Sequence, residues 1–289
     1  MRFILVHDKI KEKKLIKLEK VTKLLELAFY SAYIKDEQPV SALVTAPPEA
    51  GKTQGVMRFA GNQGIVVLTD CTAYGIMRDY GASIKEKKVR HLVIPDLVRP
   101  LSRSKDTVHS LVAFLNAIIE EGVVSISTYA EKLGVPEGKD KEQPIPVKCG
   151  LVATLAKDIL EDGRHQWSSM GFMSRLLPIS YEYSTSTKLE IHKSIANRDY
   201  KSDELITLNF PTEDIALKLE LKEAQELMLL SGQLAEGNAE KTYGFRLQKH
   251  IQRLAMANAL KQNRDVVNTE DVQLLQELSD CINLAYYPM

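Results

Sequence analysis

Residues 40–53 read Val40-Ser-Ala-Leu-Val-Thr-Ala-Pro-Pro-Glu-Ala-Gly-Lys-Thr53, an apolar run followed by a proline-containing turn and a Gly-Lys-Thr triplet. The second half fits the pattern GxxxxGK[ST], except that alanine occupies the position of the first glycine. A strand before this motif and a helix after it allow backbone N–H groups and a helix N-terminus to hold phosphate oxygens. The stretch therefore predicts a P-loop between a buried strand at 40–45 and a helix that starts at Gly51.

Two residues of the predicted P-loop have specific roles in binding ATP with Mg²⁺. Lys52 is expected to reach the β and γ phosphates, and the Thr53 hydroxyl is expected to ligate the metal ion. The alanine at the loop entrance restricts φ, and the two prolines that follow can pre-set a tight turn in its place. The predicted cofactor-binding residues are Ala46, Pro47, Pro48, Glu49, Ala50, Gly51, Lys52 and Thr53.

Short apolar runs recur downstream of the P-loop. Residues 64–69, 91–95 and 149–156 are rich in Val, Ile and Leu, as buried parallel strands are. Helical periodicity at 11–34 and 105–121 alternates with these runs, which favours an α/β sheet with crossover connections. After about residue 211 only helices are expected, at 213–230, 244–262 and 269–285. We therefore predict an α/β core over 1–210 and an α-helical subdomain over 211–289.

A second acidic ligand for the metal is expected at the end of another strand. Asp96 follows the run at 91–95 and takes the position of a Walker B aspartate, a second Mg²⁺ ligand. Leu97 stands next, where most proteins of this kind place a glutamate that polarises the attacking water. Asp70, at the end of the preceding strand, could replace that glutamate or could simply cap a loop. Glu49 is a weaker candidate for the same role.

Composition limits the partners that the chain can have. Lysine plus arginine (38) equals aspartate plus glutamate (38), so the chain as a whole has no basic field that would indicate nucleic acid. Three separate cysteines suggest neither a disulfide framework nor a zinc site. No apolar run is long enough to span a membrane. These features lead us to expect a soluble, cytoplasmic protein.

The order of motifs resembles that of the AAA+ ATPases, in particular the group with minichromosome-maintenance helicases and MoxR-type ATPases. Residues 115–126 resemble the helix and segment that precede the pore-facing insertions of this group, and 149–155 resemble its sensor 1 strand, with Thr154 as sensor. Residues 171–176 resemble the family's SRF-like segment, which implies that Arg175 reaches the nucleotide of a neighbouring subunit. Residues 244–255 and 267–272 are similar to the lid helices, with Arg246 at the sensor 2 position.

The resemblance implies a P-loop NTPase (AAA+) core, with a parallel sheet flanked by helices, and a C-terminal α-helical lid. It also implies a homo-oligomer, such as a hexameric ring, with ATP at the subunit interface. Arg164 is an alternative to Arg175 as the arginine that crosses the interface. Lys132, Lys139 and Lys141 could face a central channel and hold nucleic acid, or could belong to a solvated loop with the acidic residues among them.

Three kinds of work fit this interpretation. The first is a DNA-associated motor or remodeller of the replication or mobile-element type. The second is a MoxR-like chaperone that remodels a protein partner, which the neutral charge favours. The third is a slow nucleotide switch, because Leu97 follows Asp96 in place of a glutamate.

Overall fold

A five-stranded parallel sheet with strand order β2-β3-β4-β1-β5 forms the centre of the protein. We describe it from a computed structural model, in which residues 17–122, 146–198, 205–236 and 244–284 are described. The run at 40–45 forms β1, and those at 64–69, 91–95 and 149–156 form the next three strands, as predicted. The strands are β1 (Ala42–Ala46), β2 (Ile65–Val67), β3 (His91–Ile94), β4 (Gly150–Ala156) and β5 (Leu177–Ser180).

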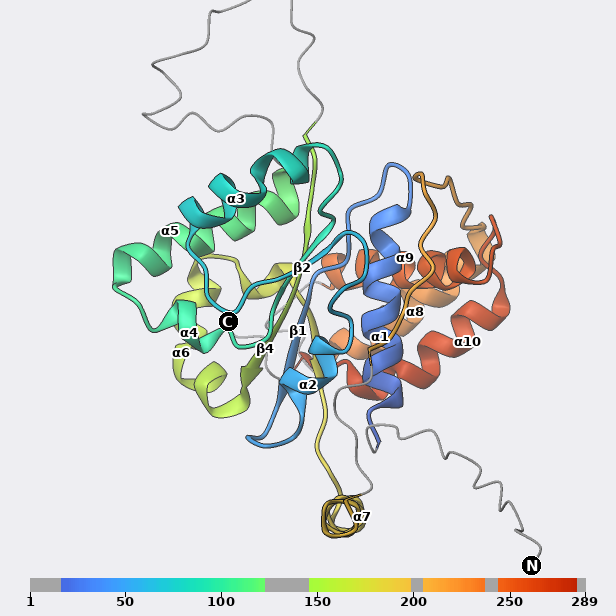
Figure 1. The fold of residues 1–289 in the computed structure, drawn as a ribbon. Coiled ribbons are helices and arrows are strands. Elements are labelled where there is room, and N and C mark those ends of the chain that lie inside the picture. The colour runs from blue at the N-terminus through green and yellow to red at the C-terminus, as the bar shows by residue number, and fades with distance from the viewer. Residues whose placement is uncertain (1–16, 123–145, 199–204, 237–243, 285–289) are drawn as a thin grey trace, which may run out of the picture.

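Helices cover both faces of the sheet, as Figure 1 shows. Alternate strand residues face opposite cores, so that Leu43 packs with one set of helices and Val44 with the other. Leu92 and Val93 divide in the same way. The helices whose apolar residues pack in the core with Leu43 are α3 (Ala73–Lys85), α5 (Lys105–Asn116) and α6 (Lys157–Ser169).

The other core joins the C-terminal helices to the N-terminal helix. Helix α1 (Glu19–Tyr30) packs across α9 (Phe245–Lys261), and α8 (Leu221–Glu236) and α10 (Thr269–Leu278) contact α9 as well. Residues of β1, β3 and β4 contribute to this same core. The boundary at residue 210 therefore stays a prediction, because the C-terminal helices share their hydrophobic core with the sheet.

The expected helix at 213–230 is wrong at its start. Residues 205–220 form no helix, and α8 begins at Leu221. Within this stretch Ile206, Leu208 and Phe210 pack against the core at every second position, the period of extended chain. Bridges from Ile34 to Ile215 and from Lys218 to Val266 fix the stretch to the body. The alternation favours extended structure over a helix.

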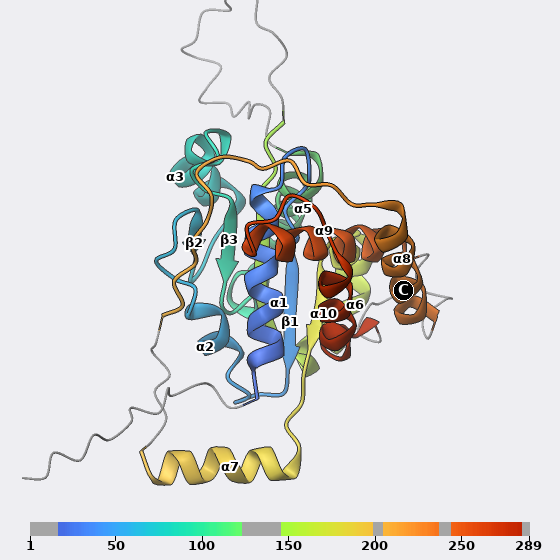
Figure 2. The ribbon, with the colours of Figure 1, turned by 90° about the vertical axis from the view of Figure 1, so that its right-hand side faces the viewer.

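Other elements were not expected from the sequence. They include β5, α3, α6 and α7 (Thr185–Ala196), together with α4 (Val98–Leu101). Helix α2 (Lys52–Met57) is shorter than a typical helix, and α5 continues into a π-helical turn at Ala117–Glu121. Helix α7 stands apart from the rest of the protein (Figure 2), and most of its side chains are exposed.

Among the described residues, no helix is both long and apolar enough to cross a membrane.

Candidate nucleotide-binding site

The P-loop lies between the carboxyl end of β1 and the start of α2, the arrangement that the sequence predicts. Gly51 precedes the helix with a φ of 80°, a left-handed conformation that side chains with a β-carbon rarely adopt. Glu49 also has a positive φ of 62°, and its side chain is exposed. The turn that 46–51 form thus depends on glycine at its last position.

The ammonium group of Lys52 lies back over its own loop. Its Nζ donates to the carbonyl oxygens of Ala46 at 2.8 Å and Pro47 at 2.7 Å. Burial lowers the pKa of Lys52, while Asp96 and Asp158 raise it. The lysine is therefore partly desolvated and within the loop, where a phosphate oxygen could replace a carbonyl as its partner.

Two tyrosines from the end of β5 hold the loop from outside. The hydroxyl groups of Tyr181 and Tyr183 both donate to the carbonyl oxygen of Ala50, at 2.8 and 2.9 Å. Burial raises the pKa of both phenols, so they remain protonated donors. The sequence did not point to these tyrosines, because β5 itself was not expected.

The carbonyl of Pro95, which follows β3, accepts hydrogen bonds from two threonines on neighbouring elements. Thr53 Oγ1 donates to it at 3.2 Å, and Thr154 Oγ1 on β4 donates to it at 2.6 Å. Asp96 follows Pro95 directly, and its Oδ1 accepts a hydrogen bond from the N–H of Val98. Because β4 lies between β1 and β3, Thr154 stands between the P-loop and Asp96. Three of the predicted site residues are thus brought to one edge of the sheet.

The oxygens at this edge fit a magnesium ion. The Thr53 hydroxyl donates its proton to Pro95, which leaves its lone pairs available to a metal. The half-exposed Asp96 offers a carboxylate, and hydroxyl and carboxylate oxygens are the ligands that Mg²⁺ accepts beside nucleotide phosphates. Both residues that were predicted as metal ligands have the chemistry that the ion requires.

Leu97 and Asp70 occupy two of the positions at which an acid that polarises the attacking water was considered. Leu97 is 1% exposed and packs in the sheet core. Asp70, at the end of the neighbouring strand β2, forms an ion pair with Arg103, which holds the pKa of the carboxyl below its usual range. A carboxylate engaged in this way is a weaker base than a free one.

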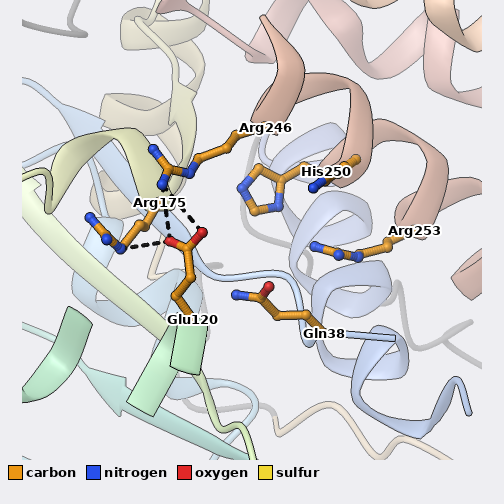
Figure 3. Close-up of a pocket in the computed structure, with 7 residues that line it drawn as sticks. Gln38, Glu120, Arg175, Arg246, His250 and Arg253 are labelled. Carbon is orange, nitrogen blue, oxygen red and sulfur yellow. Dashed lines mark hydrogen bonds and ion pairs between the residues drawn. The ribbon is translucent and has the colours of Figure 1, made fainter. Parts of the chain in front are cut away.

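The two predicted arginines lie at the opposite edge of the sheet from the P-loop. Arg175 lies two residues before the start of β5, and Arg246 lies in the first turn of α9. One carboxylate joins them, as Figure 3 shows. Glu120 Oε2 lies 2.7 Å from Arg175 Nε, and its Oε1 lies 3.2 Å from the Arg246 guanidinium. Arg246 also donates to the Ser174 hydroxyl at 3.0 Å.

A pocket of about 190 Å³ surrounds this group and is rich in positive charge. Its histidine, His250, is buried, and neither ring nitrogen forms a hydrogen bond of good geometry, although the ring lies beside the backbone of Arg175. Burial lowers the pKa of His250 to about 3, so the ring is neutral. The residues that line the pocket are Gln38, Glu120, Arg175, Arg246, Lys249, His250 and Arg253.

The structure therefore groups the predicted residues into two sites. Lys52, Thr53, Asp96 and Thr154 belong to the carboxyl edge, with Asp70 at the end of a strand on that same edge. Arg175 and Arg246 belong to the amino edge. The residues that the sequence did not single out are Glu120, Ser174, His250, Tyr181 and Tyr183. The Arg164 side chain and Lys132, Lys139 and Lys141 lie outside the description of the structure.

Comparison with known proteins gives a likeness in fold. No protein-family model matches the chain, and no curated protein matches it in sequence. Among solved structures, the chain is similar to that of a full-length MCM homolog from Methanopyrus kandleri, with a TM-score of 0.50 and 14% sequence identity. The match covers 95% of this chain and 57% of that one, so the chain spans little more than half of the length of its structural neighbour.

At this sequence identity, the likeness concerns the fold alone. It agrees with the α/β class, with the parallel sheet flanked by helices and with the helical C-terminal region. The α/β class, the parallel sheet and the helical C-terminal region that the sequence predicts are thus confirmed. The similar structure is a minichromosome-maintenance homolog, and it gives no support to a resemblance to MoxR-type ATPases.

Proposed function

We propose that this chain is an AAA+ type ATPase that binds ATP with Mg²⁺ at the carboxyl edge of its sheet. The observation that carries the proposal is the convergence of Thr53, Thr154 and Asp96 around the Pro95 carbonyl, next to a P-loop that holds Lys52. Residues at the start of α2, within β4 and after β3 supply the groups that phosphoryl transfer uses.

Each residue of this edge has a defined task. Backbone N–H groups of the P-loop bind phosphate oxygens, and Lys52 moves from the Ala46 and Pro47 carbonyls to the β and γ phosphates. Thr53 and Asp96 hold Mg²⁺, which neutralises charge on the phosphates. Thr154 turns its hydroxyl proton from the Pro95 carbonyl to the γ-phosphate or to the attacking water, since it lies between Thr53 and Asp96.

The active enzyme is a homo-oligomer, such as a ring. Phosphoryl transfer needs positive charge on the equatorial oxygens of the γ-phosphate. Arg175 is available for this task, but it lies at the edge of the sheet opposite to the P-loop of its own subunit. Arg246 shares its carboxylate partner with Arg175, so both arginines act on the nucleotide of an adjacent subunit.

The substrate that best fits the fold is DNA, on which the ring acts as a cytoplasmic motor or remodeller. The similarity to an MCM homolog supports this choice over a protein substrate. A slow nucleotide switch is the second candidate, because Leu97 is buried and Asp70 is paired with Arg103. On that alternative, ATP binding controls assembly, and turnover is slow.

Nucleotide binding is tested by calorimetric titration of ATP and Mg²⁺ into the wild type and Lys52→Ala. The variant should lose at least tenfold in affinity, since it lacks a charge-assisted contact to the phosphates. Lys148→Ala removes a lysine at the other edge of the sheet and should bind as the wild type does. Unchanged affinity of Lys52→Ala would refute the proposal.

DNA and protein substrates are separated by the ATPase rate at two salt concentrations. A DNA-dependent motor should hydrolyse ATP faster with DNA present, and this stimulation should fall between about 50 and 200 mM salt. The reason is that binding to DNA phosphates releases counterions, so the affinity for DNA falls about 10-fold or more over this range for a few contacts. Stimulation by neither single-stranded nor double-stranded DNA would exclude the motor. Multiple turnovers at a steady rate would exclude the switch.

A further inference from the structure

Glu120 joins two arginines that come from distant parts of the chain. Arg175 lies before β5, Arg246 lies in the first turn of α9, and Glu120 lies in the π-helical turn that follows α5. Glu120 Oε2 is shared by the two guanidinium groups, and Oε1 accepts a second hydrogen bond from Arg246 (Figure 3). Each arginine has a second anchor, Gly171 O for Arg175 at 2.6 Å and the Ser174 hydroxyl for Arg246 at 3.0 Å.

The positive charge of the pocket lining makes the Glu120 carboxylate necessary for holding the two arginines in place. Four cationic side chains line the pocket, with Glu120 as its one acidic lining residue among those described. The neutral His250 offers no further charge, and Arg253 is paired with Glu37 at 2.8 Å. Without Glu120, Arg175 and Arg246 would repel each other across the pocket and spread over several rotamers. Glu120 therefore sets the separation and direction of the two guanidinium groups.

A π-helical turn is an uncommon conformation that occurs mostly at functional sites. Here it occupies 117–121 and contains Glu120, whereas a regular α-helix would rotate this residue differently about the helix axis. The hydrogen bond from Gln38 to the carbonyl of Ile119 anchors the same turn. The π-helical backbone thus directs the Glu120 carboxylate toward both arginines.

We propose that Glu120 is a positioning residue for hydrolysis in the neighbouring subunit. It holds Arg175 and Arg246 as a preorganised pair, so that both reach the γ-phosphate of an adjacent subunit together. This inference rests on the proposed action of Arg175 across an interface. Preorganisation lowers the cost of arranging the charges in the transition state and leaves the affinity of each subunit for its own ATP unchanged.

The test is the steady-state ATPase rate of Glu120→Gln. Gln is similar in size but lacks the charge, and we expect kcat to fall about tenfold with an unchanged KM for ATP. Glu120→Asp keeps the charge on a shorter side chain and should recover part of the rate. Glu121→Gln, a change at the adjacent exposed residue, should behave as the wild type. Equal kcat values for Glu120→Gln and the wild type would overturn the inference.

Mixing variants shows at which nucleotide Glu120 acts. Lys52→Ala protein has an intact arginine pair, so mixing it with Glu120→Gln should restore turnover at the interfaces where the two intact halves meet. Mixing Glu120→Gln with Arg175→Ala should restore none, because both variants are defective on the same side. Recovery in this second mixture would refute the assignment.

The proposed function fails separately from this inference. If Arg175→Ala hydrolyses ATP as the wild type does, or if its mixture with Lys52→Ala restores no activity, action across the interface is wrong. If Arg175→Ala behaves as proposed but Glu120→Gln keeps the wild-type kcat, Glu120 alone is misassigned. Thermal unfolding of each variant checks that the fold is retained.

Discussion

Acidification from pH 7 to pH 5 should destabilise the protein through two buried histidines. His91 is 1% exposed, with its ring edge-on to Phe29 and its Nε2 3.2 Å from the Val40 carbonyl. Burial lowers the pKa of His91 from 6.5 to about 4 and that of His250 from 6.5 to about 3. The unfolded chain therefore binds protons at pH 5 that the folded chain excludes.

The sign and size follow from this difference. For a histidine with a depressed pKa, stability is fully present above pH 6.5 and is lost as the pH falls toward the folded-state value. Between pH 7 and pH 5 each ring should cost about 2 kcal/mol, or about 4 kcal/mol for the pair. Carboxylates such as Asp70 and Asp214, whose pKa values are lowered in the fold, contribute mainly below this window.

Urea unfolding at a series of pH values measures the effect. His250→Gln should remove about half of the dependence, because one of the two titrating rings is gone. His109→Gln, a change at an exposed histidine on α5, should leave the dependence unchanged. A change of less than about 1 kcal/mol in the wild type over this window would refute the reasoning, as would an equal slope for wild type and His250→Gln.

Three further changes test other parts of the structure. Asp271 is fully buried and accepts hydrogen bonds from Arg264, Asn258 and the N–H of Asn268, so Asp271→Ala should lower the free energy of unfolding by about 3–5 kcal/mol. Glu270→Ala, at the exposed residue beside it, should change this free energy little, and similar losses for the two variants in urea unfolding would contradict the prediction. Tyr181→Phe and Tyr183→Phe should each leave Ala50 O one donor, and the double variant should lose more ATP affinity than the two single losses combined; additive losses would argue against a shared role. Arg103→Ala should raise the ATPase rate, because it frees the Asp70 carboxylate from its ion pair, and Asp70→Asn should abolish turnover. A wild-type rate for Asp70→Asn would show that another residue polarises the water.

The local pattern was sufficient to predict the P-loop and its strand. The apolar run at 40–45 and the glycine at 51 each act within a few residues, and the helix capped by Asn268 was likewise found from local periodicity. Asp96 was predicted because it follows an apolar run, whereas Thr154 was predicted from the resemblance of 149–155 to a sensor 1 strand; their roles stay predictions.

Longer-range features were not predictable in this way. Glu120 and Arg246 are 126 positions apart, and their ion pair depends on how α5 and α9 meet, which no periodicity encodes. Strand β5 was missed because it is four residues long and contains a proline, which is tolerated at the edge of the sheet. Residues 213–220 were assigned to a helix although Ile215, Leu217 and Leu219 recur at every second position, the period of extended chain.

The separation of P-loop and arginine pair gives the chain two unlike ends. One end carries Lys52, and the other carries Arg175. Copies joined through these ends are all oriented in one direction, so the contact is heterologous: it either closes on itself after a fixed number of copies or continues as a filament. An isolated chain, or the last copy of an open row, would leave one P-loop without its arginines. Completeness of the assembly, rather than abundance of the chain, would then set the number of competent sites.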